Sequence, residues 1–179
     1  MKKHYTGPAK ALHWLTAALI LTAFPLGVYM HDLKLSPAKL QLYSYHKWIG
    51  MTALLIAIVR IAWRFAKGAP APLPAPAWQH KVASLTHGLL YALMFAVPLS
   101  GWLMSSAKGF PVVYLGVLPL PDLVAKNAEL GDLLKEIHEL LNFGLITLVG
   151  LHLAAALKHH FIDRDETLVR MSPLPSTAK

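Results

Sequence analysis

The chain has 179 residues, of which 55% are apolar and only 15% are charged, and it contains no cysteine. The absence of cysteine excludes disulfides, iron–sulfur clusters and thiolate-bound metals, and the apolar excess favours a membrane protein over a soluble domain. The formal net charge of +8 follows from the membrane topology derived below, so we do not expect a nucleic-acid partner.

Uncharged stretches long enough to cross a bilayer predict the architecture. Residues 11–30, 82–107 and 140–157 carry no charge, and a shorter uncharged run at 48–59 continues through Arg60 to residue 65. Because about 20 apolar residues span a bilayer, we predict an all-α, integral membrane four-helix up-down bundle in a single domain, residues 1–179. The helices are expected near 8–31, 46–66, 80–106 and 134–161, with a proline-rich linker at 67–77 and a long loop at 108–133.

The distribution of basic residues predicts the orientation of this bundle in the lipid bilayer. Eleven of the 17 Lys and Arg residues fall on the side that carries both termini and the 67–77 linker. Cytoplasmic connections are enriched in Lys and Arg, so both termini are predicted to be cytoplasmic. We call this side inner and the side of the 108–133 loop outer.

Five histidines lie within or at the edge of the apolar runs: His13, His46, His87, His138 and His152. His138 and His152 are fourteen residues apart in one predicted helix. That interval returns the second imidazole to within about 40° of the first, after a rise of about 21 Å. The same interval joins His13 to Gly27, His46 to Arg60 and His87 to Gly101. The pattern predicts two stacked sites inside the bundle.

The outer level of the predicted bundle combines His46 and His138 with Gly27 and Gly101. Two imidazoles can ligate a heme iron from both sides, and two residues without side chains leave room for the porphyrin. Zinc fits less well because structural zinc takes four protein ligands and catalytic zinc three. The alternative for the two glycines is that they only permit close helix packing.

The inner level holds three histidines, His13, His87 and His152, together with Arg60. Two of the imidazoles can be heme ligands while the third is spare, and Arg60 can pair with heme propionates. Two simpler interpretations stay open. Arg60 could be an anchor whose charged end reaches the membrane surface, and a histidine inside a membrane could simply hydrogen-bond between helices.

Several motifs resemble those of the bacterial diheme cytochrome b561 family, which is related more distantly to the b-type cytochrome subunits of membrane hydrogenases and formate dehydrogenases. The resemblance covers nearly the whole chain, and its most specific part is the last motif. The matching elements are His-Trp at 13–14, His46 with Arg60 later in the same helix, His87-Gly88, His-Glu at 138–139, and Gly-Leu-His-x-Ala-Ala-Ala-Leu-x-His-His at 150–160.

This resemblance implies two noncovalent heme b cofactors in a multi-pass protein of the bacterial inner membrane. By the family pattern, His46 and His138 would ligate the iron of the outer heme, and His13 and His152 that of the inner heme. The first pair agrees with the sorting by depth. At the inner level, spacing alone does not exclude His87 as a ligand, and the resemblance leaves it free for a propionate or a quinone.

The resemblance also implies one-electron transfer between a periplasmic donor, either a small anion or a protein, and ubiquinone. Some family members are similar to superoxide oxidases, so the expected activity is that of a superoxide:ubiquinone membrane oxidoreductase. Lys158 and His159 offer hydrogen-bond donors and a proton source on the quinone side, and membrane anchoring is the favoured alternative for His159.

Two other functions remain open at this stage. The chain could be a cytochrome subunit that relays electrons from a separate periplasmic dehydrogenase, with the long outer loop as the docking surface. It could also be a heme-free membrane protein whose histidines hydrogen-bond between helices.

Overall fold

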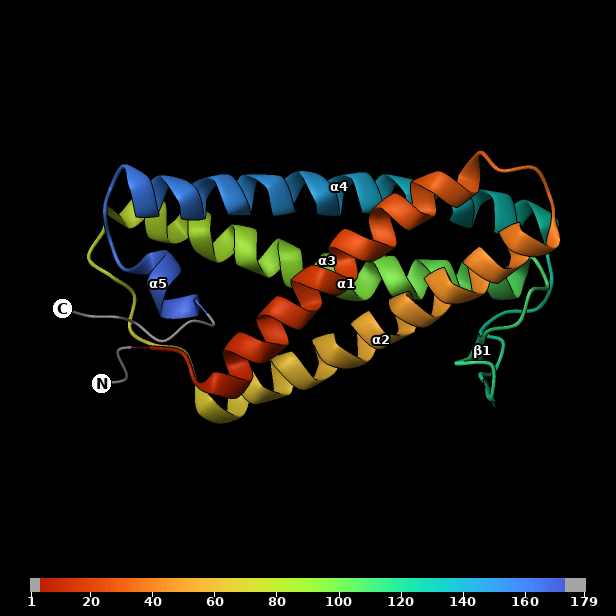
Figure 1. Cartoon of the computed structure of the whole chain (residues 1–179), viewed down its shortest axis with the longest axis horizontal. Coiled ribbons are helices and arrows are strands. Elements are labelled where there is room, and N and C mark those ends of the chain that lie inside the picture. The colour runs from red at the N-terminus through yellow and green to blue at the C-terminus, as the bar shows by residue number, and fades with distance from the viewer. Residues whose placement is uncertain (1–3, 173–179) are drawn as a thin grey trace.

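The computed structural model describes residues 4–172 and contains four long helices, one short helix and a two-stranded hairpin (Figure 1). Each long helix packs against the next in the chain, so the four run up and down as predicted. The elements are α1 (Gly7–His31), α2 (Pro37–Lys67), α3 (Ala77–Ala107), β1 (Val113–Tyr114), β2 (Leu118–Pro119), α4 (Ala128–Phe161) and α5 (Thr167–Met171).

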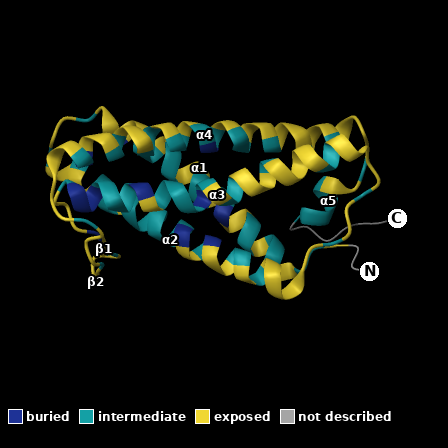
Figure 2. Ribbon diagram, turned by 180° about the vertical axis from the view of Figure 1, so that it is seen from behind, coloured by how far each residue is buried: buried dark blue, intermediate teal, exposed yellow. Residues whose placement is uncertain are grey.

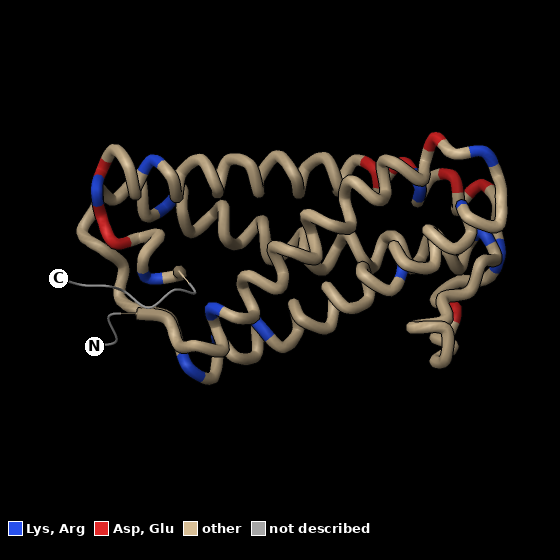
Figure 3. Tube along the Cα trace, viewed as in Figure 1, with Lys and Arg blue, Asp and Glu red and all other residues tan. Residues whose placement is uncertain are grey.

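All four long helices are long and apolar enough to cross a membrane. Exposed residues cover their outward faces along most of their length (Figure 2), and these faces carry large apolar side chains such as Leu21, Leu55, Leu85 and Leu151. Charged residues gather toward the two ends of the bundle (Figure 3). An apolar belt between two charged ends matches a bilayer, so the chain is a multi-pass integral membrane protein.

Both ends of the described chain lie at the same end of the bundle (Figure 1). This is the end predicted to be inner, and we keep the names inner end and outer end for the two ends of the bundle. The 67–77 linker is also at the inner end, while the hairpin of β1 and β2 is at the outer end. All four helices therefore connect in the order that the sequence predicts.

Two helices begin earlier than the apolar runs predict. The structure starts α2 at Pro37 rather than near 46, and α4 at Ala128 rather than near 134. Ser36 Oγ accepts a hydrogen bond from the Lys39 N–H at 3.2 Å, and Asn127 Oδ1 accepts one from the Leu130 N–H at 3.0 Å. Serine before proline and asparagine are typical helix starts, so each helix carries a polar extension beyond its apolar run and shortens the outer loops.

The short helix α5 returns to the inner end of the bundle and is bonded to three separate segments. The Trp14 indole N–H of α1 donates to the Met171 carbonyl at 2.9 Å, and the Arg170 guanidinium donates to the Ala71 carbonyl of the linker at 2.9 Å. The third contact is with the end of α4, which packs against α5.

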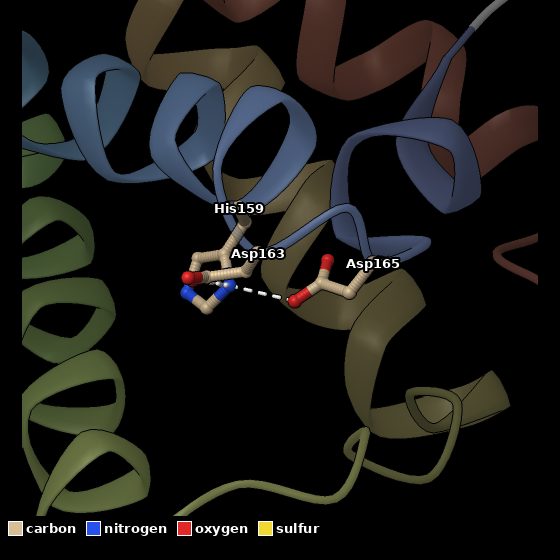
Figure 4. Close-up of side chains that lie close together, drawn as sticks. All are labelled: His159, Asp163 and Asp165. Carbon is tan, nitrogen blue, oxygen red and sulfur yellow. Dashed lines mark hydrogen bonds and ion pairs between the residues drawn. The ribbon is translucent and has the colours of Figure 1, made fainter.

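An ionic cluster fixes the turn between α4 and α5 (Figure 4). His159 Nδ1 lies 2.7 Å from Asp165 Oδ2 and 3.2 Å from Asp163 Oδ2, and Lys158 Nζ lies 2.6 Å from Asp163 Oδ2. The Thr167 N–H donates to the other oxygen of Asp165 at 2.8 Å. Partial burial raises the pKa of Asp165, but the hydrogen bonds from Thr167 and His159 outweigh it and hold that pKa below its usual value.

Replacing Asp165 by Ala is expected to loosen α5, because the first N–H of that helix loses its acceptor and His159 loses the nearer of its two carboxylate partners. The loss of one such capping contact costs about 1 kcal/mol, or roughly fivefold more frequent opening. Hydrogen–deuterium exchange over residues 166–172 measures this. Because the pKa of Asp165 is depressed in the folded state, acidification through that pKa should give the same effect, whereas neutral pH should not.

Glu166→Ala is the matched control, since no side-chain contact of Glu166 is found in the described part of the chain and the residue lies in the same turn. Equal exchange in the Asp165 and Glu166 variants would contradict an anchoring role for the cluster.

Candidate functional site

The outer level brings together one imidazole from α2 and one from α4. The rings of His46 and His138 have centroids 6.3 Å apart and planes inclined by 87°. Each ring also lies against a glycine of a neighbouring helix. A Cβ added to Gly27 would lie 3.1 Å from His46 Cε1, and one added to Gly101 would lie 3.0 Å from His138 Cε1. Both glycines therefore permit a close approach between a helix backbone and an imidazole ring.

The orientation of His138 is fixed by α3. Its Nδ1 lies 3.0 Å from the Val97 carbonyl oxygen and 2.9 Å from Ser100 Oγ, and Ser100 Oγ itself donates to the same carbonyl at 2.8 Å. Because a carbonyl only accepts, Nδ1 carries the proton and Nε2 keeps its lone pair. That tautomer is the one in which a histidine binds a metal through Nε2. No pattern in the sequence pointed to Val97 or Ser100 as partners of this histidine.

His46 lacks such a partner. Its Nδ1 is buried and has no hydrogen-bond partner within the described residues. The ring borders a cavity that it shares with His138, and most other side chains around this cavity are apolar, including Leu19, Leu93 and Ile146. An unpaired buried nitrogen costs about 1–3 kcal/mol. The apolar lining suits a group that is itself apolar, and the free Nε2 of His138 offers it one nitrogen ligand.

The inner level collects a side chain from each of the four long helices. The His152 ring of α4 lies 6.2 Å from the His13 ring of α1 and 5.3 Å from the His87 ring of α3, measured between centroids, with planes inclined by 70° in both cases. Arg60 of α2 completes the group, because its Nη2 lies 2.9 Å from His13 Nδ1. The four residues that the sequence spacing assigns to this level therefore lie together in the structure.

Arg60 is directed into the bundle rather than to the membrane surface. The guanidinium carbon of Arg60 lies 5.3 Å from the centre of the Tyr91 ring. Its Nη2–H donates to His13, and because a guanidinium only donates, His13 accepts at Nδ1. Arg64, one turn further along α2, is exposed. Arg60 is therefore placed as an internal cation beside the histidines, which a surface anchor would not be.

Lys158 and His159 lie apart from the inner level, in the ionic cluster with Asp163 and Asp165 (Figure 4). An open pocket of about 370 Å³ lies between α2 and α3 at the inner end, and Arg64 and Tyr91 are its polar side chains. Sequence reasoning missed this pocket because its walls come from separate segments. The available signal was an arginine and a tyrosine near the same predicted membrane surface.

The sequence model for the prokaryotic cytochrome b561 family matches residues 4–173. The chain belongs to this family. Two relatives come from Escherichia coli (strain K12). Cytochrome b561 homolog 2 is 34% identical over 163 residues, which cover 90% of this chain and 87% of the relative. Cytochrome b561 homolog 1 is 34% identical over 166 residues, which cover 90% of this chain and 93% of the relative. A protein of Yersinia pestis named probable superoxide oxidase CybB is 28% identical over 184 residues that cover 97% of this chain and 98% of the relative.

Membership confirms the resemblance stated from the sequence and has three consequences. This cytochrome b561 family member is a membrane heme protein, its cofactor is b-type heme, and its location is the bacterial inner membrane. The residues fit such a group. Partly buried imidazoles from different helices, a His138 ring whose Nε2 lone pair is free and an apolar cavity wall are what a noncovalent heme needs.

Replacing Gly101 by Ala is expected to push the His138 imidazole away from its position, because the new methyl group would lie 3.0 Å from the ring. If His138 holds heme, the purified protein should retain less heme b per chain, as measured by the pyridine hemochromogen spectrum. Gly88→Ala is the matched control in the same helix, since no atom lies within 4 Å of the added carbon. Equal heme content in both variants would show that the Gly101 contact does not matter for heme binding.

Proposed function

We propose that this protein is a diheme b-type cytochrome that transfers electrons between a periplasmic donor, with superoxide as the leading candidate, and ubiquinone. The observation that carries the proposal is that two imidazole pairs lie at two depths of the bundle, each with one histidine from α4. The His46–His138 and His13–His152 rings have centroid separations of 6.3 Å and 6.2 Å. Two sites of nearly equal dimension at two depths support a chain of two redox centres.

The ring separations also support a particular set of ligands. Imidazole nitrogens lie about 2 Å from a transition metal, so two rings facing each other across one metal have centres about 6 Å apart. The His46–His138 and His13–His152 pairs both have this separation between ring centroids. The His87 and His152 ring centroids are closer, at 5.3 Å. We therefore assign His46 and His138 to the outer heme and His13 and His152 to the inner heme. His87 stays available for a propionate, a hydrogen bond or a quinone.

The side chains around these ligands have separate tasks. When bound, each heme supplies an iron that accepts and releases one electron. The Val97 carbonyl holds His138 in the tautomer with a free Nε2 lone pair. Arg60 donates to His13 Nδ1, so the proton of that ring is on Nε2. Binding of an iron through Nε2 would require this proton to move to Nδ1 and Arg60 to release the ring. Arg60 would then be the cation available to the propionates, since a guanidinium forms strong paired hydrogen bonds with carboxylates.

Superoxide as the donor is supported by charge at the outer end and by the name of the Yersinia pestis relative. Lys108 pairs with Asp132 at 2.9 Å and Lys135 with Glu139 at 3.4 Å, so these two lysines are largely neutralised. Lys47, next to His46, donates to the neutral Phe110 carbonyl at 3.0 Å and forms no salt bridge among the described residues, although the Asp122 carboxylate is near enough to attract it. A local cation beside the outer pair favours encounter with a small anion.

The quinone would react at the inner end, which we propose to be cytoplasmic. Two superoxide ions each lose one electron to become dioxygen, and ubiquinone takes up these two electrons with two protons to become ubiquinol. Lys158 and His159 can supply or relay those protons, and Asp163 and Asp165 hold the two side chains in place through ion pairs and hydrogen bonds. The pocket beside Arg64 and Tyr91 is a second place for the quinone ring.

Substitution of each proposed ligand tests the heme assignment. We expect two hemes b per chain in the wild type, one in each of the His13→Ala, His46→Ala, His138→Ala and His152→Ala variants, and two in His87→Ala. Reduced-minus-oxidised spectra of the monodisperse, folded fraction measure this. Loss of heme in His87→Ala with retention in His13→Ala would overturn the inner assignment. A colourless, folded wild type would overturn the whole proposal.

Substitution at the inner end tests the quinone assignment. Lys158→Ala with His159→Ala should slow superoxide-driven ubiquinol formation about tenfold or more, since a positioned proton donor contributes at least that much. Heme content should stay unchanged. Asp163→Asn is the matched control, because it disrupts the same cluster while keeping both donors. An unchanged rate in the double variant would refute this site.

The relay function gives a different result in the same assay. If superoxide fails to reduce the hemes but a separate periplasmic dehydrogenase reduces them, the chain is the cytochrome subunit of a larger complex and the superoxide proposal is wrong.

A further inference from the structure

The outer loop contains an unusually apolar segment that the function proposed above does not use. Residues 110–121 read Phe-Pro-Val-Val-Tyr-Leu-Gly-Val-Leu-Pro-Leu-Pro and contain no charged side chain, with Lys108 before them and Asp122 after them. The segment is too short to span a bilayer. Such a run in a loop exposed only to water would leave a large apolar surface uncovered.

The hairpin within this segment lies against the side of α2 rather than over the end of the bundle (Figure 1). The Trp48 indole N–H donates to the Val113 carbonyl at 2.7 Å, and the Tyr114 hydroxyl lies 3.0 Å from Thr52 Oγ1. Trp48 is the first residue of the uncharged run of α2 and follows Pro37 by eleven positions, about 16 Å along the helix. The hairpin therefore reaches the depth at which α2 becomes apolar.

The side chains at the tip of the hairpin point away from the protein. Leu115 is 55% exposed, Val117 81% and Leu118 54%. None of them has a charged neighbour within the hairpin itself. Lys47 donates to the Phe110 carbonyl at the base of the segment. An apolar tip with charge at its base has the polarity of an element that enters a membrane interface.

The backbone of the hairpin is also suited to an apolar environment. The Gly116 N–H donates to the Val113 carbonyl at 3.2 Å, and the Val117 N–H donates to the Tyr114 carbonyl at 3.1 Å. Pro119 contributes no N–H at all. Positive φ angles at Leu115 and Gly116, 53° and 75°, close the turn. Internal pairing of this kind is what lipid-facing backbone requires, since lipid offers no hydrogen-bond partners.

We propose that the tip of this hairpin, formed by Leu115, Val117 and Leu118, inserts into the bilayer leaflet at the outer end and binds lipid acyl chains. Its position beside the apolar run of α2 makes its exposed face continuous with the lipid-facing surface of the bundle. A soluble electron donor would approach from the end of the bundle, where the charged residues gather. The hairpin is thus a lateral membrane anchor, held to α2 by Trp48 and Thr52.

The absence of cysteine in the chain allows a direct test. A nitroxide label is attached to a Val117→Cys variant in lipid nanodiscs, and EPR measures its collision rates with two probes. Oxygen concentrates in lipid, whereas a polar nickel chelate stays in water. The matched controls are Leu151→Cys, at a position 60% exposed on the apolar face of α4, and Asp122→Cys at the base of the segment.

We expect the oxygen-to-nickel collision ratio at position 117 to match that at position 151 and to exceed that at position 122 about tenfold. A ratio equal to that at position 122 would place the tip in water and overturn the proposal. Low collision rates with both probes would show that a second copy of the chain or another protein covers the tip, and that result would overturn it equally. Retained heme content in each labelled variant verifies that the fold is intact.

Discussion

The geometry of α4 determines how the rest of the molecule is arranged. His138 and His152 are fourteen residues apart on this helix, so their imidazoles project in similar directions with nearly four helical turns between them. The other histidines of the two levels, and Gly101, lie next to one of these imidazoles, while Gly27 contacts His46 and Arg60 contacts His13. His46 and Gly101 lie beside the first, while His13 and His87 lie beside the second. The other three long helices supply partners at the depths that α4 sets.

The two levels differ in how their imidazoles are held. At the outer level a backbone carbonyl of α3 orients His138, and a glycine backbone lies against each ring. At the inner level the partner is a cation, since Arg60 donates to His13. A carbonyl in a helix is fixed in place, whereas an arginine side chain can change partners. His138 is therefore oriented by a backbone group, whereas His13 is oriented by a side chain.

The sequence predicted the membrane bundle well because length and charge alone decide which segments span a bilayer. It also brought the correct residues to each level, since depth follows from counting along helices. The helix starts at Pro37 and Ala128 were missed because apolar runs were weighed more heavily than the capping signals at Ser36 and Asn127. A rule based on caps would have found both.

Other features were beyond the reach of sequence patterns. The bond between His138 and Val97 joins residues 41 positions apart and depends on how α3 and α4 are rotated about their axes. Helix packing also determines whether the Arg60 side chain reaches the membrane surface or His13, so the sequence alone could not decide between the two. The sequence did not predict the hairpin of β1 and β2 for another reason. A strand of two residues gives no alternating pattern, so only the run of apolar residues in the loop pointed to it.

The contact between Trp14 and Met171 has a consequence for how the molecule is made. These residues are 157 positions apart, and the indole belongs to α1, which leaves the ribosome before α4 and α5. The bond cannot form until the intervening residues have been synthesised and all four spans have entered the bilayer. Until then α1 packs mainly against α2. The contacts that join α5 to α1 and to the 67–77 linker at the inner end therefore form late in assembly.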